Sequence, residues 1–308
     1  MSAGGASIVE KRRVLGYIIR LLLGVAVIWA VCVTTGNYSA VKVESSREFF
    51  VFLCAAFFSQ FLAALLAGLA LFYACGGCER LLWLLVVHFA GYLMAEATPG
   101  RIGYFGLLGL VKEKLRLFSS IAVVQGAGLL TRLAAVVLLL AVAPEALVER
   151  STAGLLVLPV LVLTGFIALL HEGLWARLRG LAENVASRNL ANKLEEARTA
   201  IIEGVRNPRV LLLVLLSWPF TAMRWYFSAL AVGIDAPFPL IMAVHPIVYV
   251  AAFVPLTPGG LGVVEAAGTG LLAVFGYPSG LVLVSLLLDR LVEILVSLPF
   301  GVYVALRR

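Results

Sequence analysis

Several charged side chains stand inside long apolar runs, where they could bind a polar ligand within a membrane. An ionised side chain near the centre of a membrane helix costs at least ~2.5 kcal/mol, so such residues usually serve a function or pair with one another. Because a planar guanidinium suits bidentate binding of phosphate, the arginines are predicted to take up a phosphate. The carboxylates would bind an ammonium group, carry a coupling proton or hold the arginines in place. Buried ion pairs that only fix helix packing are the alternative. The residues are Glu96, Arg101, Arg132, Arg224, Glu265, Asp289, Arg290 and Glu293.

The charged residues near the C-terminus have helical spacing. Asp289 and Glu293 are i,i+4 neighbours and Arg290 reaches Glu293 at i,i+3, so one helix face is expected to carry a mixed charge cluster. Arg132 has the equivalent position in the first half of the chain, without an acidic neighbour in its own helix. Arg224 stands beside two aromatic residues and is expected to snorkel outward rather than to bind a ligand.

Two Thr-Pro-Gly-x-x-Gly turns, at 98–103 and 257–262, are expected to position these charges. Proline ends or kinks a helix, glycine allows positive φ, and the amides that start the next helix can bind an anion. Such bare backbone is tolerated in a bilayer only where it is buried or lines a cavity, although a purely structural packing turn is the alternative. The predicted substrate-binding residues are Arg101, Arg132, Arg290, Glu96, Glu265, Asp289, Glu293, Thr98, Gly100, Gly103, Thr257, Gly259 and Gly262.

Other motifs point away from catalysis. Cys75 and Cys78 form a CxxC, but the sequence has neither a second CxxC nor a His pair, so ordinary thiols or a local disulfide are expected rather than zinc. His88 and His245 precede the two turns and are more typical of hydrogen-bonded core residues than of a proton relay. The sequence contains no HExxH motif, Walker loop or Ser-His-Asp order. We therefore expect neither an enzyme nor a bound cofactor or metal.

Composition indicates an all-α polytopic membrane protein. The chain has 308 residues, of which 62% are hydrophobic and 13% charged, half the charged content of a typical soluble domain. The apolar runs reach 18 residues or more, long enough to cross about 30 Å of hydrocarbon as helices. Without period-2 alternation a β-barrel is not expected. The net charge of +7 fits retention of helices on the cytoplasmic side better than nucleic-acid binding, because no basic patch is interleaved with aromatics.

Helix lengths and the Lys/Arg bias predict the path through the membrane. About six full transmembrane helices are expected, near 14–35, 48–74, 118–142, 153–171, 209–232 and 279–304. A segment that crossed fully at 81–97 would leave a piece too short to return, so 81–111 and 237–276 are predicted to be re-entrant. An amphipathic insertion at about 172–208 is expected to lie on the cytoplasmic surface. The protein is expected in the plasma membrane, with both termini cytoplasmic.

The chain repeats itself. The two turns match, and Thr131-Arg132-Leu133 matches Asp289-Arg290-Leu291 at nearly the same separation. We expect one transmembrane domain, 1–308, with repeat one at about 14–142 and repeat two at about 153–305. The predicted path runs the repeats in opposite directions. Inverted repeats with broken helices meeting near the midplane are typical of alternating-access transporters.

With these motifs in view, the chain resembles the flippase-like transmembrane domain of lysylphosphatidylglycerol synthases and their stand-alone relatives. The strongest match is the segment from Pro255 to Glu265, while Thr98–Gly103 with Arg132 resembles the first signature of that family. Relatives commonly have an acidic residue where this chain has Tyr104, and Glu96 could substitute for it only from the other side of the turn. The resemblance implies movement of a polar-headed lipid, and the soluble aminoacyl-transferase domain of fused members is not expected.

The main hypothesis is therefore a flippase or transporter that moves a phosphate-bearing lipid, a phospholipid or polyprenyl-phosphate lipid, between leaflets. A proton- or ion-coupled carrier of a small anion is the first alternative. A second is a non-transporting membrane partner of a lipid- or glycan-synthesis enzyme, acting through residues 172–208. Membrane lipids are the expected partners, and a homodimer stays open.

Overall fold

The structure is a computed structural model of the whole chain. It describes residues 46–125, 171–185 and 206–307, together with isolated positions between 22 and 33, at 127–128 and between 192 and 202. The predicted helices 14–35 and 153–171, and most of 118–142, therefore fall outside the described residues. The described residues are helical, and their one β-bridge joins Pro99 to Pro258.

The described helices agree closely with the apolar runs. α2 (Ser46–Cys75) and α9 (Pro208–Ala231) are long and apolar enough to cross a membrane. α12 (Ser279–Leu306) has 28 residues but carries three charged residues near its middle. α9 begins where Pro208 supplies a preset φ and the Asn207 side chain accepts a hydrogen bond from the amide of Arg209 at 3.0 Å.

Two interrupted segments accompany the long helices. The first is α3 (Leu81–Glu96), the turn at 98–101 and the 3-10 helix η2 (Ile102–Leu110). The second is α10 (Phe238–Val250), the 3-10 helix η3 (Ala251–Phe253), a turn and α11 (Val263–Val274). At 1.5 Å per residue the 16 residues of α3 extend about 24 Å, less than the ~30 Å of a hydrocarbon core.

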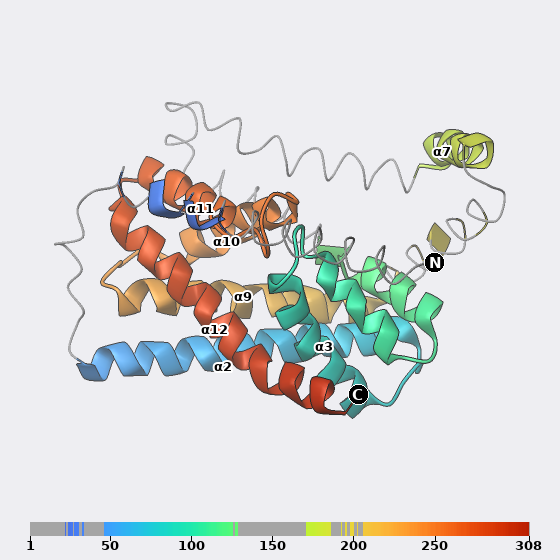
Figure 1. Ribbon diagram of the computed structural model, residues 1–308, viewed down its shortest axis with the longest axis horizontal. Helices are drawn as coiled ribbons and strands as arrows, with labels where there is room; N and C mark the ends of the chain where they lie inside the picture. The colour runs from blue at the N-terminus through green and yellow to red at the C-terminus, as the bar shows by residue number, and fades with distance from the viewer. Residues whose placement is uncertain are drawn as a thin grey trace, which may run out of the picture.

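α2 packs along α9 in the opposite direction, and α12 crosses both (Figure 1). The antiparallel sense follows from two contacts. Arg224 near the end of α9 donates to Gln60 in the middle of α2, while Arg209 at the start of α9 lies 5.6 Å from the ring centroid of Tyr73 near the end of α2.

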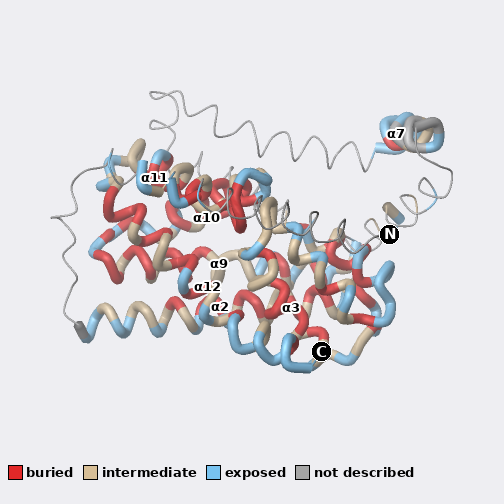
Figure 2. Tube along the Cα trace, in the orientation of Figure 1, coloured by how far each residue is buried: buried red, intermediate tan, exposed pale blue. Residues whose placement is uncertain are grey.

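Apolar packing divides into two main clusters. One lies among α9, α10, α11 and α12, and includes Trp225, Ile241 and Leu272. The other joins α2, α3, η2 and the helix that begins at 114, and includes Leu84 and Leu117. A smaller cluster joins α2 to α9. Buried residues run along α10, α11 and α12 in Figure 2. The polar network described below lies between the two main clusters.

Large apolar side chains also face outward. They occupy one side of each long helix, as expected for surfaces that meet lipid rather than water. Examples on α2, α9 and α12 are Phe50, Phe58, Leu212, Leu216, Leu291 and Val302.

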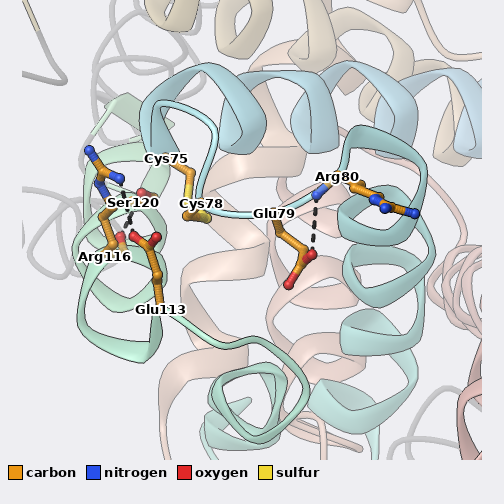
Figure 3. The surroundings of a disulfide bond; sticks show 7 residues. All are labelled: Cys75, Cys78, Glu79, Arg80, Glu113, Arg116 and Ser120. Atoms are coloured by element: carbon orange, nitrogen blue, oxygen red, sulfur yellow. Dashed lines mark hydrogen bonds and ion pairs between the residues drawn. A yellow bond between two sulfur atoms is a disulfide. The ribbon is translucent and has the colours of Figure 1, made fainter.

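Cys75 and Cys78 form a disulfide in the turn between α2 and α3, the second of the two outcomes expected for this CxxC (Figure 3). Both cysteines are buried, while Gly76 and Gly77 between them have positive φ. The helix that begins at 114 packs against this end of α2 and α3, and there Arg116 pairs with Glu113 at 3.1 Å on the surface.

α7 (Glu172–Val185) lies within the predicted amphipathic insertion. Its Trp175 indole donates a hydrogen bond to the carboxylate of Glu195, and Arg198 lies 5.3 Å from the Trp175 ring. That hydrogen bond, assisted by Arg198 and Arg179, lowers the pKa of the Glu195 carboxyl. These contacts tie α7 to the segment that follows it.

Candidate functional site

The two Thr-Pro-Gly-x-x-Gly turns touch each other. Pro99 and Pro258 form an antiparallel bridge, and the amide of Gly259 donates to the carbonyl of Thr98 at 2.9 Å. Main chain from segments far apart in the sequence therefore meets directly. Because each turn interrupts a helix, this contact satisfies polar backbone groups that an apolar surrounding would leave unpaired.

The turns share an unusual backbone. Gly100 and Arg101 have φ of 62° and 57°, and the residues at the same places in the second turn, Gly259 and Gly260, have φ of 56° and 73°. Glycine adopts this region freely, whereas a residue with a Cβ is strained there by about 1–2 kcal/mol. Among the described residues Arg101 is the one non-glycine with positive φ. Strain of this kind is concentrated at functional sites.

Four ionisable residues cross-link the turns and α12. Arg101 pairs with Glu293 of α12 and with Glu96 at the end of α3. In the opposite sense, Arg290 of α12 pairs with Glu96 at 2.6 Å. Each side of the contact thus supplies one arginine and one carboxylate to the other. Such reciprocal pairing fixes α3 and the first turn against α12.

Glu265 joins the second turn to the same network. One carboxylate oxygen accepts from the Gly262 amide at 2.6 Å and caps α11, while the other accepts from Arg290 Nε at 2.8 Å. Arg290 also donates to the carbonyl of Gly259 at 3.1 Å. The predicted i,i+3 pair of Arg290 with Glu293 is therefore wrong, because the Arg290 side chain turns to Glu265 and Glu96 instead.

The expectation that the Arg224 side chain points outward is wrong. Its side chain does not snorkel outward: the residue is 1% exposed and its guanidinium binds both oxygens of Asp289, at 2.6 and 2.9 Å. It also donates to Glu293 at 2.7 Å, to Gln60 at 2.6 Å and to the hydroxyl of Tyr249 at 3.0 Å. The face of α9 that carries Arg224 packs against α2 and α12, so these partners replace water.

Sequence reasoning missed Gln60 and Tyr249. Gln60 had a signal, because Ser59 and Gln60 are the polar pair inside the otherwise apolar run of α2. Tyr249 had none, since a tyrosine near the end of an apolar helix is ordinary. Its hydroxyl donates to Asp289 in the structure.

We call the connected set of ion pairs the charge clamp. It joins α3, the first turn, α9, α11 and α12 within the apolar interior. Its members are Glu96, Arg101, Arg224, Glu265, Asp289, Arg290 and Glu293. Six of the predicted site residues are brought together here, whereas Arg132 lies outside the described residues.

The six remaining predicted residues lie in the turns, where several of their amides are engaged within the protein. The amide of Gly103 donates to Thr98 Oγ1 at 2.5 Å, and those of Gly259 and Gly262 bind a carbonyl and the Glu265 carboxylate. Thr257 is fully buried, and its hydroxyl has no partner among the described residues.

The unused hydrogen-bonding groups of the charge clamp are donors of an arginine rather than carboxylate oxygens. Each oxygen of its four carboxylates already accepts a hydrogen bond from an arginine, a tyrosine or a backbone amide. Arg224 uses all three of its nitrogens. Arg101 bonds both of its partners through Nη2, so its Nε and Nη1 have no acceptor among the described residues.

Arg101 also borders a cavity of about 260 Å³. Its walls come from α2, α3, the first turn, η2, the helix that begins at 114, and the region of Tyr249 and Phe253. The polar side chains on these walls are His88, Tyr92, Arg101, Tyr104, Gln125 and Tyr249. His88 Nδ1 and the Tyr104 hydroxyl are 2.5 Å apart and form a hydrogen bond.

Within the described residues no group of histidine, cysteine and carboxylate side chains could hold a metal ion. The clamp carboxylates are engaged by arginines, and the cavity offers aromatic hydroxyls and a guanidinium. Such a donor set suits an anion.

The fold and the site define a helical membrane protein with a buried charge clamp where two interrupted helical segments meet. The sequence profile of the Lysylphosphatidylglycerol synthase TM region matches residues 17–301, and the chain belongs to this family. The resemblance inferred from the two turns is thereby confirmed. A UPF0104 membrane protein from Methanothermobacter thermautotrophicus is similar, with 30% identity over 84 residues. That match covers 27% of this chain and 25% of the relative.

Proposed function

We propose that the protein moves a phosphate-bearing lipid between the two leaflets. The head group would pass the charge clamp while the acyl or prenyl chains stay in the bilayer. Membership of a family named for the membrane region of a lipid synthase supports a lipid-related role. The exposed apolar faces of α2, α9 and α12 support contact with lipid on several sides.

One observation carries the proposal: the unused groups of the clamp are guanidinium donors, and those of Arg101 lie at the wall of a cavity. Nε and Nη1 lie on either side of Cδ, so each can donate a single charge-assisted hydrogen bond to a phosphate oxygen. The carboxylates hold Arg101 from behind through its remaining nitrogen. The clamp thus presents a positioned arginine without first breaking an ion pair.

The arrangement of the two turns supports alternating access. α2 and α9 are antiparallel, the turns have matching φ values, and the two interrupted segments touch at their turns. In our proposal these are two inverted repeats, with α3–η2 and α10–α11 entering from opposite faces. Exchange of the Arg101–Glu293 and Arg290–Glu96 pairs would then accompany the change of access.

The test is transfer of a fluorescent phosphatidylglycerol in proteoliposomes containing the purified chain. Arg101→Lys keeps the charge and the backbone but removes the unused Nε and Nη1 donors, so we expect transfer to slow at least tenfold. Arg116→Lys is the matched control, because Arg116 lies on the surface and is more than half exposed. Transfer at equal rates in Arg101→Lys and the unaltered protein would remove Arg101 from the proposal.

Two further outcomes separate the alternatives. Uptake of soluble glycerol phosphate without lipid transfer would favour a carrier of small anions. If the well-folded protein transferred neither lipid nor soluble anion, transport would be contradicted. That result would favour a non-transporting partner of a synthesis enzyme, which needs no activity of its own.

A further inference from the structure

The cavity beside Arg101 has a chemistry of its own, which bears on the kind of head group. The cavity is smaller than the ~300–1,000 Å³ usual for drug-sized ligands, so it can hold a head group but not two acyl chains. Of the described residues that line it, none is a carboxylate, and one, Arg101, has a permanent charge.

The hydroxyls of Tyr92 and Tyr104, the amide of Gln125 and the imidazole of His88 complete the polar wall. These groups can donate to or accept from hydroxyl groups. Tyr104 is fixed by its hydrogen bond to His88 and by edge contact with Tyr92, whose ring centroid is 6.1 Å away. The wall is therefore ordered and neutral apart from the guanidinium.

A head group with an ammonium ion would find no carboxylate among the described residues of the wall. The nearby clamp carboxylates Glu96 and Glu293 each bind two arginines and have no oxygen left over. Moving an ammonium ion out of water without a counter-charge is costly, and Arg101 would repel it. A phosphate linked to a hydroxyl-bearing group instead meets the unused Nε and Nη1 donors of Arg101 and the aromatic hydroxyls.

We infer that this cavity is a head-group subsite for a phosphate that carries hydroxyl groups, and that it discriminates against head groups with an ammonium ion. The inference rests on the proposed function and narrows its substrate class. Selectivity arises from the absence of a carboxylate among the described wall residues, and the residue after the first turn, Tyr104, keeps that position uncharged.

The experiment measures stabilisation of the purified full chain by short-chain lipids, from the midpoint of thermal unfolding at several ligand concentrations. The probes are dihexanoyl phosphatidylglycerol, dihexanoyl phosphatidylethanolamine and free glycerol 3-phosphate. We expect the phosphatidylglycerol to bind at least tenfold more tightly than the phosphatidylethanolamine.

Gln125→Glu then adds a carboxylate to the wall with almost no change of side-chain shape. It should narrow or reverse the preference by tenfold or more. Asn207→Asp is the matched control, since it adds the same charge at the start of α9, where aspartate also caps a helix. Tyr104→Glu repeats the test deeper in the cavity.

Each result has one meaning. Equal binding of both lipids, or an unchanged preference in Gln125→Glu and Tyr104→Glu, would overturn the inference while transport of lipid still stood. Stabilisation by glycerol 3-phosphate but by neither lipid would keep the phosphate subsite and contradict the lipid as its source. No stabilisation by any probe would overturn the subsite, and the transfer assay would decide the proposed function separately.

Discussion

Arg224 and Arg101 of the charge clamp should lose very different amounts of stability on the same conservative change. Arg224 donates five hydrogen bonds, to Asp289, Glu293, Gln60 and Tyr249, and so uses every N–H of its guanidinium. A lysine has three donors on one atom and must lose at least two of these five hydrogen bonds.

Hydrogen bonds to charged groups contribute about 1.5–3 kcal/mol each, and breaking a buried ion pair costs about 3–5 kcal/mol. Arg224→Lys should therefore lower the free energy of unfolding by about 3–5 kcal/mol. Arg101→Lys should lower it by less than about 1 kcal/mol, because its two hydrogen bonds leave from one nitrogen and an ammonium ion can keep both.

The assay is reversible unfolding in mixed detergent micelles followed by tryptophan fluorescence, to which Trp225 beside Arg224 contributes. Arg116→Lys, on the surface, should lie within about 0.5 kcal/mol of the unaltered protein. Lipid transfer is measured on the same preparations. A loss below about 1 kcal/mol for Arg224→Lys, or equal losses for both variants, would refute the division into a structural and a ligand-binding arginine.

Three further changes test the surroundings of the clamp. Gly103→Ala should prevent folding, because the new Cβ would lie 2.0 Å from the carbonyl oxygen of Met94; loss of folded protein in size-exclusion chromatography would show this, and a normal yield would contradict the packing described. Glu265→Gln removes a charged helix cap and a buried partner of an arginine, and should cost about 3 kcal/mol in the same unfolding assay; a change near zero would contradict the stabilising role of these two contacts. The pKa of the Glu195 carboxyl is lowered in the fold, so its contribution to the stability of α7 is present above the unfolded pKa and is lost as pH falls through the folded pKa. Trp175→Phe removes the hydrogen bond that lowers this pKa, and should weaken the acid sensitivity of α7 measured by hydrogen exchange. A pH profile of exchange unchanged by the substitution would contradict this prediction.

The long helices could be read from the sequence because their length and composition are set by the solvent. The bounds of α2, α9 and α12 differ from the expected ranges by about two residues, within the usual uncertainty of helix ends. The turns were also visible, since the residue types of a Thr-Pro-Gly-x-x-Gly run leave few alternatives to a helix break. Expected helix number, inverted topology and membrane side stay predictions.

The pairing within the clamp could not be read in the same way. Glu96 and Arg290 are 194 residues apart, and Arg224 and Asp289 are 65 apart, so no local spacing indicates either pair. Arg224 was assigned wrongly for a definite reason. Neighbouring aromatic residues are typical of the membrane interface, but here the Trp225 indole donates to Ser285 Oγ at 3.0 Å in the interior.

The difference between the two turns gives the strongest reason to regard Arg101 as functional. At the fourth place of the turn, where both copies need a left-handed residue, the second copy has Gly260 and the first has Arg101. Packing alone would favour glycine, because it removes about 1–2 kcal/mol of strain. Gly260 could not carry a side chain in any case, since a Cβ would lie 2.7 Å from the Cα of Ala252. The first turn instead has an arginine there, and its unused Nε and Nη1 donors belong to a side chain that borders a cavity. The two turns thus share a left-handed backbone, and only in the first does a side chain accept the strain of that conformation, which is the cost we expect a functional guanidinium to justify.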